Sequence, residues 1–147
     1  MKDPATSVRI GYKAKLDGNV LYKGHPIKWY GRRVPNGAIT PYGYFPRQNG
    51  VNDGTKTSFV TSHEIDVEIV LGTDTGTEQN DLDDLSNQTL QIIARMRVQD
   101  CPQFPGFVNV GTKFERSTEI TDYDNTYTYL RKILTFSNII YEGGFGS

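Results

Sequence analysis

Three acidic residues occupy alternate positions of one segment, at Glu64, Asp66 and Glu68. In an extended strand, alternate side chains lie on the same face about 6.6 Å apart. Such a row could hold a divalent cation or form an acidic ridge against a neighbouring subunit. It is more simply a solvated strand face whose carboxylates pair with basic side chains of adjacent strands. The candidates for that pairing are Lys28, Arg131 and Lys132. Acid–base catalysis is not indicated, because it needs carboxyl groups held in different environments, and no companion histidine or nucleophile motif is found.

The histidines, the single cysteine and a glycine-containing segment form no known motif. His25 and His63 lack the HxH or HxxxH spacing of a zinc site. Cys101 has no partner for a disulfide or a two-thiol metal site. The segment Gly72–Thr77 precedes a helical pattern but lacks the lysine and the Ser/Thr of a phosphate-binding loop. The sequence therefore predicts no metal, no cofactor and no enzymatic activity.

Aromatic and arginine side chains gather in three segments. They are Trp29, Tyr30, Arg32 and Arg33, then Tyr42, Tyr44, Phe45 and Arg47, then Tyr123, Tyr127 and Tyr129. These residue types are enriched at protein interfaces, although ordinary packing between strands would also gather them. Stacking on single-stranded nucleic acid needs a positively charged groove, and a net charge of −1 disfavours it. We therefore expect no specific nucleic-acid binding.

Composition and length indicate one domain. The chain has 147 residues, of which 36% are hydrophobic and 12% aromatic, enough for one core. We expect this domain to span residues 1–142 and to be followed by a flexible glycine-rich tail at 143–147. The N-terminus lacks the apolar run of a signal peptide, and no stretch approaches the ~18 residues of a membrane helix. These features favour a protein made in the cytoplasm, with no membrane partner.

The elements that position these residues follow from hydrophobic periodicity. A helix over Asp81–Arg97, with Asn80 as N-cap and Arg95 and Arg97 in its last turn, is the strongest signal. Its apolar stripe is formed by Leu82, Leu85, Thr89, Ile92, Ile93 and Met96. A shorter helix is expected over Thr6–Leu16.

The remaining periodic segments predict strands. They are Val20–Tyr22, Ile27–Tyr30, Thr40–Phe45, Ser58–Leu71, Phe107–Thr121 and Tyr127–Glu142. A turn at Asp122–Asn125 joins the last two strands, and Arg47–Lys56, rich in Asn and Gly, is expected to be a loop. Strands on both sides of one strong helix indicate an α+β fold: an antiparallel or mixed sheet with the helix at about 81–97 and the short N-terminal helix packed on one face.

In this order the segments resemble the tail-terminator, or tail-completion, family of minor tail proteins from tailed bacteriophages. The resemblance covers roughly residues 16–142. It is carried by Leu16-Asp17-Gly18, the strand ending in PIKWY at Tyr30, the TPYGYF segment from Thr40 to Phe45, the Asn- and Thr-rich loop through Thr55, the SHEIDVEIV strand from Ser62 to Val70, the helix of DLxxLxxxxLxII type and two closing strands.

The resemblance implies a structural virion protein located in the tail or neck. Such a subunit would form a ring, often six-fold with twelve-fold as an alternative, that caps the tail tube and meets the head-side connector and portal-side proteins. We expect its contacts at Gln48–Thr57, at Glu64–Glu68 and at the hairpin tip Asp122–Tyr127. The individual candidates are Arg47, Asn49, Asn52, Asp53, Lys56, Glu64, Asp66, Glu68, Tyr123, Asp124 and Tyr127. Two alternatives stay open: a head-completion or connector ring of a short-tailed phage, and a small module that binds a ligand or nucleic acid.

Overall fold

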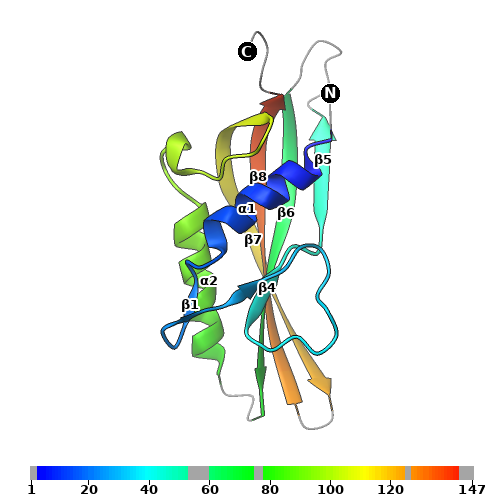
Figure 1. The fold of residues 1–147 in the computed structure, drawn as a ribbon, viewed down its shortest axis with the longest axis vertical. Helices are drawn as coiled ribbons and strands as arrows, with labels where there is room; N and C mark the ends of the chain where they lie inside the picture. Colours follow the sequence, from blue (N-terminus) through cyan, green and yellow to red (C-terminus); the bar gives the residue numbers. More distant parts are fainter. Residues whose placement is uncertain (1–2, 53–59, 75–77, 125–126, 143–147) are drawn as a thin grey trace.

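The computed structural model describes residues 3–52, 60–74, 78–124 and 127–142. In this part of the chain, a six-stranded sheet carries two helices on one face (Figure 1). The helices are α1 (Ala5–Leu16) and α2 (Gln79–Ile93), and a short 3-10 turn spans Val98–Asp100. The strands are β1 (Leu21–Tyr22), β2 (His25–Pro26), β3 (Lys28–Trp29), β4 (Tyr42–Tyr44), β5 (Gln48–Asn52), β6 (Val60–Thr73), β7 (Phe107–Asp124) and β8 (Tyr127–Glu142).

The sheet has the order β3-β4-β6-β8-β7, and β5 also pairs with β6. β3 and β4 are parallel, whereas the pairs that involve β6 and β8 are antiparallel. β1 and β2 form a separate hairpin, whose turn residues Lys23 and Gly24 both have positive φ. Such φ values match the right-handed twist of the flanking strands. The mixed sheet with two helices on one face confirms the predicted α+β fold.

Alternation along the central strands places the core on the helix-bearing face. Ile65, Val67 and Ile69 of β6 are fully buried there, as are Leu134 and Phe136 of β8. α1 crosses this face obliquely (Figure 1) and buries a row at fourfold spacing, which lies on one side of a helix. The row consists of Val8, Tyr12 and Leu16. α2 adds Leu82, Leu85 and Ile93 to the same core.

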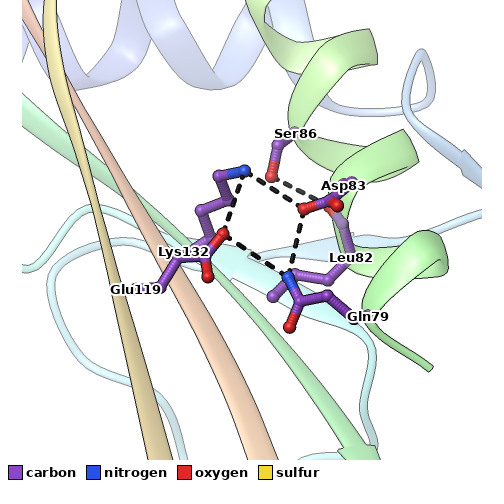
Figure 2. Close-up of polar contacts among 6 residues, drawn as sticks. All are labelled: Gln79, Leu82, Asp83, Ser86, Glu119 and Lys132. Carbon is purple, nitrogen blue, oxygen red and sulfur yellow. Dashed lines mark hydrogen bonds and ion pairs between the residues drawn. The ribbon is translucent and has the colours of Figure 1, made fainter. Parts of the chain in front are cut away.

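The two polar residues that interrupt the apolar face of β8 each have polar partners on neighbouring elements. Lys132 Nζ lies 3.2 Å from Asp83 Oδ1 of α2 and 3.3 Å from Glu119 Oε1 of β7. Gln79 donates to the same two carboxylates (Figure 2). The hydrogen bond from Gln79 and the cation of Lys132 lower the pKa of Asp83. This network attaches the first turns of α2 to the sheet.

Asn138 is the second interruption, and it is fully buried. Its Oδ1 accepts hydrogen bonds from Tyr12 Oη and from Thr112 Oγ1, both at 2.8 Å. Its Nδ2 donates to the backbone carbonyl of His63 at 3.1 Å. Since buried polar groups must be satisfied, Asn138 links α1, β6 and β7 at a single point.

The main helix is shorter at its C-terminal end than the sequence predicts. It begins at Gln79 after Glu78, with no side-chain cap, and it ends at Ile93. Ile93 is its last buried position, and the chain then turns so that Cys101 and Phe104 return to the core. Met96, expected on the apolar stripe, is therefore fully exposed. Arg95 and Arg97 lie beyond the last turn, which contains no basic residue.

The segment Arg47–Lys56 is not entirely a loop, because Gln48–Asn52 forms β5 and pairs with Thr61–Ile65 of β6. Its low strand propensity is overridden by tertiary contacts. The side chain of Gln48 donates to the Ala5 carbonyl at 2.8 Å and accepts from Arg9 at 2.8 Å. Positions 53–56 lie outside the described residues.

Asp122 and Asp124, predicted to be turn residues, belong to β7, and positions 125–126 lie outside the described residues. The glycine-rich end at 143–147, predicted to be a flexible tail, lies outside the described residues. Neither described helix has the length and apolar character that a membrane crossing requires.

Candidate assembly surface

The sheet face opposite the helices carries the candidate site. Even-numbered residues of β6 and odd-numbered residues of β8 point to this face, as the antiparallel register requires. We call it the helix-free face. Its rows run across the strands, for example Tyr42, Val70, Arg131 and Ile120, and Tyr44, Glu68, Ile133 and Thr118. One end of the face is rich in tyrosine, and the other end is charged.

A hydrogen-bonded ion network lies at the centre of the helix-free face. Tyr44 Oη donates to Glu68 Oε2 at 2.6 Å, and Arg131 Nη1 lies 2.8 Å from the same oxygen. Arg131 Nε also donates to Asp122 Oδ2 at 2.6 Å. Burial, followed by the bond to Glu68, raises the pKa of Tyr44. Burial lowers the pKa of Arg131, but Glu68 and Asp122 outweigh this effect and raise it overall. The network therefore keeps Arg131 charged and in a fixed position.

Tyrosines surround this network on the side towards the hairpin tip. Tyr30 and Tyr42 meet edge to face with ring centroids 5.7 Å apart, and Tyr42 is 6.1 Å from Tyr44. Tyr127 and Tyr129 lie 5.9 Å apart on β8. Tyr and Arg with partial exposure are the side chains that dominate binding energy at protein interfaces.

A hollow of about 230 Å³ adjoins these rings. It is lined by Ala38, Ile39, Thr40, Tyr127 and Tyr129. Ile39 is 84% exposed and Tyr127 is 47% exposed. Gly72 of β6 has no side chain, which lets Thr40 and the two tyrosine rings pack close to the sheet, and a Cβ there would lie 2.8 Å from Thr40 Oγ1. The result is an exposed apolar spot, bordered by hydroxyl groups, that a partner side chain could cover.

The three alternate carboxylates do not converge on one point. Glu68 binds Arg131, as one of the expected cross-strand pairs, and is only 5% exposed. Asp66 accepts from Thr135 Oγ1 at 2.7 Å, and Glu64 lies 3.8 Å from Arg116. Of the other proposed partners, Lys132 faces the helices instead, and the Lys28 ammonium lies over the ring of Tyr30. Within the described residues, no group of three His, Cys, Asp or Glu side chains is arranged to hold a metal ion.

Four of the predicted contact residues lie together at the charged end of the helix-free face. Arg47, Asn49, Glu64 and Asp66 line a shallow hollow of about 40 Å³, together with Gln48 and Arg116. Glu68 belongs instead to the central network. Asn52 pairs with Thr61 at the far end of β5, while Asp53 and Lys56 lie outside the described residues.

The predicted residues of the hairpin tip are divided between the two faces. Tyr127 lies on the helix-free face, whereas Tyr123, 82% exposed, lies on the other face by alternation. Asp124 is opposite Tyr127 in the register. Sequence reasoning missed Ile39, Arg116 and the central role of Arg131. In the observed register, Arg131 lies diagonally opposite Asp122 on the next strand.

No protein-family model matches the sequence, and no curated protein matches it either. Among solved structures, the chain is similar to one chain of the virion of a native gene transfer agent particle. The TM-score is 0.74 at 14% sequence identity, and the match covers 97% of this chain and 100% of the other. The two chains therefore share one fold over nearly their whole length.

Proposed function

We propose that this chain is a non-enzymatic structural subunit of a phage-like virion, located in its tail or neck. The observation that carries the proposal is the end-to-end likeness to a chain of a gene transfer agent virion. The helix-free face supports it, because Tyr, Ile and Arg side chains lie there in the arrangement of an interface. The carboxylates of this face are satisfied by Arg131, Thr135 and Arg116, which suits structural adhesion better than acid–base chemistry.

Within the virion, the role we propose is that of a tail terminator. In this role, copies form a ring that ends the tail tube and joins it to the head-side connector. The segment-by-segment resemblance to the tail-terminator family supports this finer assignment. The helix-free face would contact the adjoining virion protein, and the tyrosine-lined hollow at Ile39 would receive one of its apolar side chains.

Electron microscopy of particles produced without this protein tests the terminator role. We expect tails of abnormal length or tails without heads. Filled heads without any tail defect would contradict it, and heads that lose DNA would favour a connector ring in a short-tailed particle instead.

Complementation with Ile120→Asp, on the helix-free face, should fail. Ile10→Asp is the matched control, because Ile10 is an exposed isoleucine of α1 on the opposite side, and it should restore normal particles.

A further inference from the structure

The two ends of helix α2 carry opposite charge. At its N-terminal end, Glu78 and Asp81 are partly exposed and Asp84 is exposed. Beyond its C-terminal end, Arg95 and Arg97 are exposed. Among the ion pairs of the described residues, none uses any of these five side chains. Lys23 lies close enough to interact with Glu78 and Asp81, and Asp84 accepts a hydrogen bond from Gln88. Three carboxylates against one lysine still leave the acidic end a net negative charge that can attract a partner.

Two surface hollows lie beyond the C-terminal, basic end of α2. One hollow, of about 360 Å³, is lined by Lys15, Asn19, Ile92, Arg95 and Asp100. A second hollow, of about 540 Å³, shares Arg95 and Asp100 and is also lined by Arg97 and Met96. The two hollows together carry three cations against one carboxylate, and the fully exposed Met96 of the second hollow offers an apolar contact.

The dipole of α2 accounts for only part of this charge distribution. Acidic residues in the first turn are favourable for the helix itself. At the other end, Arg95 Nη1 donates to the Gln91 carbonyl at 3.2 Å and so satisfies one free acceptor of the last turn. Arg97 lies outside the helix, next to the 3-10 turn. Its exposed guanidinium is not required for helix capping.

We propose that the acidic end of α2 in one copy docks on the basic hollow of the next copy. Two different patches that complement each other create a head-to-tail contact, which passes from copy to copy and closes into a ring where the rotation allows. Between the two charged ends, the β1–β2 hairpin of the same chain is attached to the middle of α2. Gln88 Nε2 donates to the Leu21 carbonyl and Gln88 Oε1 accepts from the Leu21 amide. This contact rests on the proposed function, since it gives the subunit its means of self-assembly.

Charge reversal tests the contact in the purified full-length chain. Arg95→Glu with Arg97→Glu makes both ends of α2 acidic, and Asp81→Lys with Asp84→Lys makes both ends basic. Sedimentation velocity over a concentration series at low salt should show self-association of the natural chain. Either double variant should raise the apparent dissociation constant roughly tenfold or more, because like charges then meet. An equimolar mixture of the two double variants should associate again.

Arg32→Glu with Arg33→Glu is the matched control, because it makes the same change in net charge at two exposed positions far from α2 in sequence. It should leave association unchanged, and higher salt should weaken association of the natural chain. A natural chain that stays monomeric at every concentration overturns the proposal, as does a chain that stops at a dimer or a mixture that fails to associate. These outcomes are independent of the particle morphology that tests the virion role, so the two proposals can fail separately.

Discussion

The hydroxyl group of Tyr12 on α1 donates a hydrogen bond to Asn138 Oδ1 on β8 at 2.8 Å, in the fully buried centre of the protein. The same oxygen accepts from Thr112, so one side chain of β8 holds both α1 and β7 in place. The aromatic ring of Tyr12 also stacks on Phe104, with centroids 6.0 Å apart. Burial raises the pKa of Tyr12 further above its ordinary value, which keeps the hydroxyl group a donor.

Replacing Asn138 with Leu should lower the free energy of unfolding by about 2–4 kcal/mol, because it leaves several buried groups without a partner. Tyr12→Phe removes one donor and leaves Asn138 Oδ1 bound to Thr112. It should therefore lower the free energy by about 0.5–1.5 kcal/mol. Chemical denaturation of both variants measures the difference. Equal losses of unfolding free energy in the two variants would show that Asn138 is not the common partner of Tyr12, Thr112 and His63.

Replacing Arg131 with Met should destabilise the fold by about 1–3 kcal/mol, because Glu68 is then buried without its cation. This loss of unfolding free energy is smaller than for a fully buried ion pair, since the Arg131 side chain is 25% exposed. Arg131→Met combined with Glu68→Leu should recover most of the loss, because both charges are then removed. A double-mutant cycle measured by urea denaturation gives the coupling, and additive losses would contradict this account.

The stability of the fold should depend on the protonation of His63. Burial lowers the pKa of His63 below the ordinary value of 6.5, so the unfolded chain binds a proton more readily than the folded chain. The free energy of unfolding should therefore be highest above pH 6.5 and fall as the pH drops from there to the lowered pKa of the folded state. His63→Gln should flatten this part of the profile. His25→Gln, at the other histidine of the chain, is the control substitution.

Gly43 should be intolerant of a side chain. A Cβ at this position would meet the ring of Trp29, which lies on β3 next to it. Gly43→Ala should therefore lower the free energy of unfolding by about 1–3 kcal/mol through overpacking. At Gly31, a Cβ would meet no atom within 4 Å, so Gly31→Ala should have little effect. Thermal unfolding of the two variants distinguishes a steric cause from a general sensitivity to Gly→Ala changes.

Local patterns predicted the elements whose residues alternate or repeat strongly. The alternation from Ser62 to Leu71 identified β6, and the stripe from Leu82 to Ile93 identified α2. Met96 continued that stripe by spacing alone, and the sequence does not reveal that the chain must turn after Ile93 to return Phe104 to the core. Gln48–Asn52 has little strand propensity and forms β5 only because β6 offers a free edge.

The candidate site was harder to predict than the fold, because its residues come from separate strands. The tyrosine-rich segments and the Glu64–Glu68 row were visible in the sequence. The contact of Arg131 with both Glu68 and Asp122 depends on the register of three strands. The hollow at Ile39 depends on the path of a long connection between β3 and β4, which no periodicity describes.

The long pairing of β6 with β8 stabilises the centre of the sheet more than the short strands β3 and β5. Fourteen consecutive residue pairs join these two strands, from Val60–Tyr141 to Thr73–Thr128. β3 and β5, by contrast, contribute only two and five residues to the sheet. Amide hydrogens of β6 and β8 should thus exchange only through global unfolding, while those of β3 and β5 exchange through local opening. Local opening of β3 or β5 would then leave the β6–β8 centre of the sheet intact.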